Sequence, residues 1–247
     1  MKKNFTYLFL LLSFPLVGLA QEIIKPKKGL VDQKLISDQT YQLRWVMLRD
    51  TAKIQIGVVD YNVKVAGDKI QVITGVKMKG APSSWIDTTI VRKADLSPVY
   101  HSSYNAQRNM SLKFDKEITG FYLDKADGKS TKIAQTVNAG YFDSNFYPIL
   151  IAWLPLKTGY TASLDIFDYN PKGKIGLLKA NVLGVKEGNY LSKKQGERKT
   201  WEVEVSDGIS SGSDTKSTYY FDQLTRKLYK QRVNAGGRVM EMELVEQ

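Results

Sequence analysis

Trp201-Glu202-Val203-Glu204-Val205-Ser206 is the stretch that decides the fold of this 247-residue chain. Apolar side chains alternate here with polar ones, and a period of two is typical of a β-strand, in which successive side chains point to opposite faces of the sheet. Met240-Glu241-Met242-Glu243-Leu244 repeats the pattern near the C-terminus. Each segment therefore predicts a strand with one buried face and one solvated face.

The same alternation runs through most of the chain from Tyr41 onward. Further strands are predicted at residues 54–65, 69–78, 85–92, 99–104, 110–114, 131–137, 161–167, 175–183 and 219–222. Short turn sequences such as Gly67-Asp68 and Asp127-Gly128 separate them. Strands joined in this way form an antiparallel meander, which must manage its exposed edges. We expect an all-β fold in which the meander forms an open or closed barrel, with a two-layer β-sandwich as the alternative.

One segment, residues 144–154, departs from the period of two and predicts a short helix. Asp143 or Ser144 can cap its start, and Pro155 ends it. The apolar residues at helical spacing are Phe146, Ile149, Leu150 and Trp153. A helix that is apolar on nearly all sides should be buried against or inside the sheet. Either the sheet or a bound ligand must cover it, so these four residues are the candidate ligand-binding residues; a core helix without a ligand is the simpler alternative.

The N-terminal residues predict export. Lys2-Lys3 precede an apolar run over residues 5–19, and Gly18-Leu19-Ala20 suits signal peptidase. We expect residues 1–20 to be a cleaved signal peptide, residues 21–38 an extended leader, and residues 39–247 a single antiparallel β domain. The protein would then be periplasmic or extracellular after cleavage near Ala20. We expect it not to span the membrane, because the apolar run is too short and the strands carry charges.

The net charge of the chain indicates which kinds of molecule we expect as binding partners. Lys and Arg number 36 against 25 Asp and Glu, which gives a net charge of +11. An exported cationic protein meets anionic lipids, glycans and other envelope proteins, so we expect such a partner or surface and no nucleic acid. Basic side chains cluster in the leader and in one polar loop. The loop residues are Lys193, Lys194, Arg198 and Lys199. Ordinary solvated loop charge is the alternative interpretation of both clusters.

Cysteine and histidine, which often serve as catalytic groups or metal ligands, are scarce in this chain. The chain has no cysteine, which excludes disulfides and thiolate metal ligands, and His101 is its only histidine. His101 should share a strand face with Ser103, but a base two residues from a serine on one strand is poorly placed to activate it. Asp124 and Asp127 fit a hairpin turn better than a calcium loop. We therefore expect no catalytic residues, no metal and no cofactor, with an unrecognised hydrolase as a remote alternative.

Three stretches carry a family resemblance. They are Gly140-Tyr141-Phe142-Asp143-Ser144-Asn145-Phe146, Leu154-Pro155-Leu156-Lys157-Thr158-Gly159-Tyr160 and Tyr219-Tyr220-Phe221-Asp222. Over roughly residues 41 to 247 the chain resembles the exported family known as domain of unknown function 3108. That family has no catalytic residues to carry over. More distantly, a meander with a plugging helix is similar in architecture to the lipoprotein carriers LolA and LolB, whose sheet holds acyl chains.

Together these observations predict a non-enzymatic envelope protein. The first hypothesis is that it binds an apolar or amphipathic ligand in a concavity of its β-sheet. The alternative is an interaction or structural module that docks another envelope protein or an anionic surface. Fold alone does not decide between them, because one architecture serves many functions.

Overall fold

A computed structural model describes residues 22–209 and 215–246 of the chain. The predicted signal peptide and its cleavage site lie outside these residues. The described part is all-β, as the sequence predicts, with one α-helix, α1 (Tyr147–Trp153), and one 3-10 helix, η1 (Gln33–Leu35). The strands are β1 (Ile23–Ile24), β2 (Gln39–Arg49), β3 (Ala52–Ala66), β4 (Lys69–Met78), β5 (Trp85–Arg92), β6 (Pro98–Tyr104), β7 (Arg108–Phe114), β8 (Ile118–Asp124), β9 (Ser130–Gln135), β10 (Phe142–Asp143), β11 (Ala162–Tyr169), β12 (Ile175–Ser192), β13 (Gly196–Asp207), β14 (Lys216–Asp222), β15 (Leu228–Ala235) and β16 (Arg238–Leu244).

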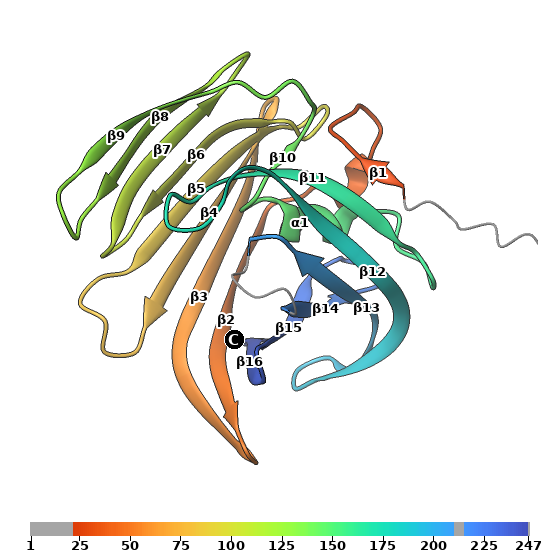
Figure 1. The fold of residues 1–247 in the computed structure, drawn as a ribbon. Coiled ribbons are helices and arrows are strands. Elements are labelled where there is room, and N and C mark those ends of the chain that lie inside the picture. Colours follow the sequence, from red (N-terminus) through yellow and green to blue (C-terminus); the bar gives the residue numbers. More distant parts are fainter. Residues whose placement is uncertain (1–21, 210–214, 247) are drawn as a thin grey trace, which may run out of the picture.

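All of these strands belong to a single sheet. Its order is β1-β11-β12-β13-β14-β15-β16-β2-β3-β4-β5-β6-β7-β8-β9, and β10 pairs with β11 beside that path. The sheet consists of two antiparallel meanders, β2 to β9 and β11 to β16, which are joined where β16 pairs antiparallel with β2. β1 and β10 pair parallel with β11. Within the described part of the chain, no hydrogen bonds join β9 to the opposite end of the sheet. The sheet curves around α1 without closing (Figure 1), which makes it the open form of the predicted barrel and not a sandwich.

The alternation of apolar and polar residues along the sequence predicted most strands correctly. β4 and β5 have the predicted bounds. The start of β4 was predictable because a two-residue turn, with Gly67 at φ 59°, separates it from β3. β12 runs well beyond the predicted end at Leu183. A register shift between Val182 and Gly184 interrupts the alternation there, and the strand then continues in pairing with β13. β2, β8 and β15 were not predicted as separate strands.

The N-terminal segment is more than the predicted extended leader. β1 pairs with β11, and η1 follows it. Ile24, Val31 and Ile36 are buried in the main hydrophobic core. A short strand and three apolar side chains therefore tie this segment to the domain.

α1 begins at Tyr147, later than predicted, and its N-cap is Phe146 and neither Asp143 nor Ser144; Asp143 instead holds the turn that precedes the helix. One carboxylate oxygen of Asp143, Oδ1, accepts hydrogen bonds from the backbone N–H groups of Asn145 at 2.9 Å and Phe146 at 3.1 Å. Pro148 occupies the first turn, where its missing N–H has no cost. The helix is buried at the centre of the main core, as predicted (Figure 1). Among the described residues no helix is long and apolar enough to span a membrane.

Candidate functional site

A cleft of about 600 Å³ opens beside the first residues of β2. β16 makes its last pair with β2 between Leu244 and Leu43, whereas β2 begins at Gln39. Residues 39–42 therefore pair with β3 on one side only, apart from one hydrogen bond of 2.8 Å from Val245 N to the carbonyl of Gln42. The cleft is lined by Thr40, Tyr41, Gln42, Asp60, Tyr61, Asn62, Ile73, Gly75, Ile86, Lys194, Gln195, Lys227, Tyr229, Leu244, Val245 and Glu246.

Two stacked tyrosines form part of the wall of this cleft. The rings of Tyr41 and Tyr61 lie 5.1 Å apart at an interplanar angle of 16°. Burial raises the pKa of Tyr61 to about 12, helped by the charge of Asp87, and burial raises the pKa of Tyr41 as well. Both phenols are therefore neutral at ordinary pH. The wall offers apolar ring faces to a ligand.

The same tyrosines also line a second, smaller space on the side of α1. This inner cavity has a volume of about 20 Å³, close to the roughly 10–15 Å³ that one water molecule requires. Ile149 and Trp153 of α1 line it, and so does Arg226 in the turn between β14 and β15. The tyrosine pair thus lies between the open cleft and the buried face of the helix.

The four predicted ligand-binding residues lie mostly in the core. Phe146 and Leu150 are fully buried and Trp153 is 1% exposed. Phe146 packs edge-to-face against Trp153, with ring centroids 5.8 Å apart. Ile149 is only partly buried and lines the inner cavity together with Trp153. Ile149 and Trp153 therefore border an internal space, whereas Phe146 and Leu150 serve the packing of the helix.

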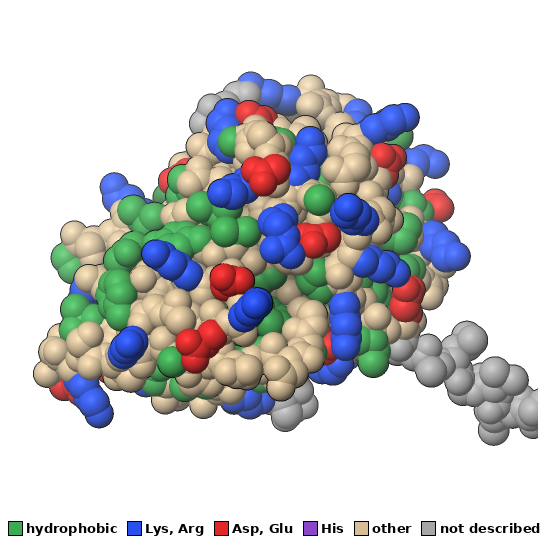
Figure 2. All heavy atoms as spheres, turned by 90° about the horizontal axis from the view of Figure 1, so that it is seen from above, with side chains coloured by type: hydrophobic (Ala, Val, Ile, Leu, Met, Phe, Trp, Pro, Cys, Tyr) green, Lys and Arg blue, Asp and Glu red, His purple; other side chains and the backbone are tan. Residues whose placement is uncertain are grey.

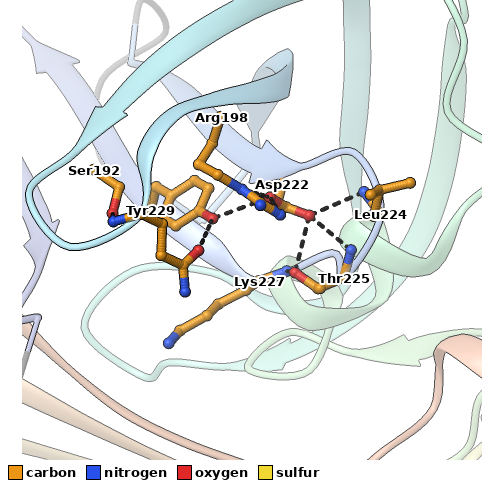
Figure 3. Close-up of polar contacts among 8 residues, drawn as sticks. Ser192, Arg198, Asp222, Leu224, Thr225, Lys227 and Tyr229 are labelled. Atoms are coloured by element: carbon orange, nitrogen blue, oxygen red, sulfur yellow. Dashed lines mark hydrogen bonds and ion pairs between the residues drawn. The ribbon is translucent and has the colours of Figure 1, made fainter.

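The carboxylate of Asp222, both of whose oxygens accept several hydrogen bonds, stabilises the turn beside the cleft (Figure 3). Asp222 is 1% exposed. Its Oδ2 accepts hydrogen bonds from Arg198 at 2.9 and 3.1 Å and from the Tyr229 hydroxyl at 3.0 Å. Its Oδ1 accepts from the backbone of Leu224 at 3.0 Å and from the backbone and hydroxyl of Thr225 at 2.8 and 3.0 Å. These bonds fix the turn that carries both cleft and cavity residues.

The protonation of Asp222 follows from these contacts. Burial alone would raise its pKa, but the hydrogen bonds from Thr225 and the charged Arg198 outweigh burial and lower it. Asp222 is therefore a carboxylate at ordinary pH. Tyr229, which donates to it, also stacks on Tyr190 of the long β12–β13 hairpin, with centroids 4.8 Å apart. The network thus connects the turn to that hairpin, whose tip contributes Lys194 to the cleft.

A second buried polar cluster surrounds His101. Its Nδ1 lies 2.7 Å from Oδ2 of Asp143, and the hydroxyl of Thr89 donates to the other oxygen of Asp143 at 3.1 Å. Within the described residues, Nε2 of His101 is buried and has no hydrogen-bond partner. Ser103 instead accepts hydrogen bonds from Trp85 and Arg108. The serine and the imidazole therefore do not form a nucleophile–base pair, and the cluster connects β5 and β6 to β10.

The sign of the pKa shift predicts how this cluster responds to pH. Burial lowers the pKa of His101, but the charge and hydrogen bond of Asp143, with smaller effects of Asp87 and Asp168, raise it above 6.5 overall. Stabilisation by the protonated pair is therefore complete below pH 6.5 and is lost as the pH rises through the raised pKa. We expect the free energy of unfolding to fall over this range in the wild type and not in His101→Gln. Denaturant midpoints measured from pH 5.5 to 9 check this, and an equal fall in both proteins would contradict it.

No group of three or more His, Asp or Glu side chains in the described part of the chain is placed to hold a metal ion. Asp124 and Asp127 each accept a backbone N–H two residues on, as expected of a hairpin turn. Lys172 forms an ion pair with Asp124 at 2.7 Å. These carboxylates are thus occupied by turn and ion-pair contacts.

Fold and cleft define an all-β protein with one open, curved sheet, a buried helix and a cleft where β2 extends past its neighbour. The chain matches the family model described as "Protein of unknown function (DUF3108)" over residues 40–243 and belongs to that family. No curated protein and no solved structure matches it. The expected likeness to lipoprotein carriers therefore has no structural match to support it.

Proposed function

We propose that the chain is an exported, non-enzymatic protein of the cell envelope that binds an amphipathic ligand in the cleft beside β2. The observation that carries this proposal is the cleft itself, with its volume of about 600 Å³. Binding sites for small molecules usually measure about 300–1,000 Å³ and combine apolar walls with a few polar groups. Export is supported by the N-terminal sequence pattern, and a non-enzymatic role by the hydrogen bonds that occupy Ser103 and Nδ1 of His101.

The lining matches a ligand with an apolar chain. Tyr61, Ile73 and Ile86 come from three adjacent strands, and Leu244 faces them from the end of β16. Each methylene group buried against such a surface contributes about 0.8 kcal/mol, or about fourfold in affinity. Affinity should therefore rise with chain length until the cleft is filled.

Filling the cleft with a side chain tests this proposal. Gly75 lies on the cleft wall, and a Cβ at this position would lie 3.8 Å from Cβ of Asp60, an ordinary contact. We expect Gly75→Leu to weaken the binding of decanoate and decanol by about tenfold or more, without lowering the denaturant midpoint. Isothermal titration calorimetry of both ligands gives the affinities.

Gly184→Leu is the matched control, because Gly184 lies in β12 with open space around its Cβ position and does not line the cleft. It should bind both ligands as the wild type does. Equal affinities in wild type, Gly75→Leu and Gly184→Leu would place binding elsewhere, and no binding by the wild type would refute the proposal.

A second candidate function is docking on an anionic surface or another envelope protein. Leu191 and Leu224 are 78% and 79% exposed, and Lys193, Lys194 and Lys199 lie on the same hairpin as Leu191. Exposed leucines beside cations suit a surface of anionic lipid. Figure 2, however, shows Lys and Arg spread over one whole face with Asp and Glu between them, and not gathered in one patch. We rank docking below ligand binding, because the cleft is a defined site with an apolar wall, whereas the two exposed leucines lie in separate segments, β12 and the turn after β14.

A further inference from the structure

Arg226 carries a partly buried guanidinium, two of whose nitrogens lack hydrogen-bond partners among the described residues. Within the described residues, its Nε and Nη1 are buried and donate no hydrogen bond. The residue also has φ 60°, in the left-handed region that residues other than glycine rarely adopt. Burying a cation whose donors are unpaired is costly. An arrangement that is costly in the free protein suggests that a ligand completes it.

The neighbouring carboxylate cannot supply the missing contacts. Asp222 acts on Arg226 electrostatically, and Arg226 N donates to its backbone carbonyl at 3.0 Å. Both carboxylate oxygens of Asp222, however, already accept three hydrogen bonds each, from Arg198, Tyr229, Leu224 and Thr225 (Figure 3). Burial lowers the pKa of Arg226, and the charge of Asp222 only opposes this effect. Two donors of Arg226 thus remain for an oxygen from outside the chain.

The surroundings of Arg226 indicate what kind of molecule could bring that oxygen. Arg226 lines the inner cavity, and among the described residues that line it there is no Asp or Glu. The others are two glutamines, Gln39 and Gln231, and residues that are aromatic or aliphatic: Tyr41, Tyr61, Pro148, Ile149, Ala152, Trp153, Tyr219, Phe221 and Leu228. The volume of about 20 Å³ admits only about one or two water-sized atoms, such as the oxygens of a small head group. A carboxylate fits such a space better than a phosphate, which has more oxygens.

The cavity and the cleft are adjacent. Tyr41 and Tyr61 line both spaces. One short segment also borders both, since Arg226 and Leu228 line the cavity while Lys227 and Tyr229 line the cleft. A molecule that reaches Arg226 past the tyrosine pair would leave its remaining length in the cleft.

We propose that Arg226 binds the carboxylate head group of a single-chain amphiphile whose apolar chain lies in the cleft. This inference rests on the proposed function and names the chemical class of its ligand. The carboxylate accepts charge-assisted hydrogen bonds from Nε and Nη1, which relieves the burial of an unpaired cation. The aliphatic chain passes the Tyr41–Tyr61 pair and covers the apolar wall of the cleft.

The test compares Arg226→Met with the wild type for decanoate, decanol and acetate, by isothermal titration calorimetry. Wild type should bind decanoate more tightly than decanol and far more tightly than acetate. Arg226→Met should lose about tenfold or more in decanoate affinity and keep its decanol affinity. Its ligand-free denaturant midpoint should be equal or higher, because the substitution removes a partly buried guanidinium of which two nitrogens lack hydrogen-bond partners. Arg49→Met, at an exposed position, is the control for the loss of one positive charge.

Each outcome decides a separate point. Equal decanoate affinity in Arg226→Met and wild type overturns the assignment of Arg226, and leaves the proposed function standing when decanol also binds. A lower ligand-free midpoint in Arg226→Met shows a structural role for the arginine and overturns the inference. If acetate binds as tightly as decanoate, the apolar chain contributes nothing, and this result overturns the assignment of the ligand as an amphiphile. Failure of decanoate and decanol alike to bind the wild type overturns both the inference and the proposed function.

Discussion

Replacing Asp222 by alanine is expected to lower the free energy of unfolding by about 3 kcal/mol, because the substitution removes a buried acceptor of several hydrogen bonds. The carboxylate is 1% exposed. Its loss leaves the guanidinium of Arg198, the hydroxyl of Tyr229 and two backbone N–H groups without their acceptor. Urea denaturation at pH 7 measures the effect.

The matched control for Asp222→Ala is Asp124→Ala. Asp124 also accepts a backbone N–H in a turn and pairs with a lysine, Lys172, but the lysine is largely exposed. Its loss should cost no more than about 1 kcal/mol. Similar losses for the two variants would show that the buried network adds nothing to an ordinary turn.

The pH dependence of Asp222 gives a second readout of the same substitution. Its pKa is lowered from 3.8 in the folded state, so its contribution is present above that value and is lost as the pH falls through the lowered pKa. The stabilities of wild type and Asp222→Ala should therefore converge in acid.

Replacing Trp153 by alanine is expected to cost about 3–5 kcal/mol of stability, as large-to-small substitutions in cores do. Trp153 is 1% exposed, packs against Phe146 and belongs to the main core. A tryptophan in an open ligand pocket would instead cost little stability and weaken binding. Denaturant midpoints separate these results.

Trp85→Ala is the control for Trp153→Ala, because Trp85 is 39% exposed at the start of β5. We expect a clearly smaller loss than for Trp153→Ala. A loss below about 1 kcal/mol for Trp153→Ala would assign the helix to a ligand pocket.

α1 shows how much of the structure the local spacing of apolar residues can predict. The helical spacing of Phe146, Leu150 and Trp153 predicted both the helix and its burial, since an all-round apolar helix has to be covered. The pattern left open whether a ligand or the protein covers it. In the structure Phe146 and Leu150 are completely buried by the protein itself.

The candidate site could not be predicted from sequence. Tyr41, Tyr61 and Arg226 belong to three separate segments, and none carries a motif of its own. They meet because β16 pairs with β2, which brings the C-terminal meander against the N-terminal one. The one available signal was Arg226 itself, an arginine in the turn after the predicted strand at residues 219–222, and that signal is common in β proteins.

The sequence by itself determined the all-β class, most strands, the buried helix and the family, because these depend on the periodicity of side chains along the backbone. Only the tertiary structure decided that the sheet stays open, that the N-terminal segment packs in the core, that a cleft lies beside β2, and that an arginine with two unpartnered nitrogens, among the described residues, borders the cavity beside the helix. These features depend on which distant strands pair and where each pairing ends, and alternation within a single strand carries no information about its partner.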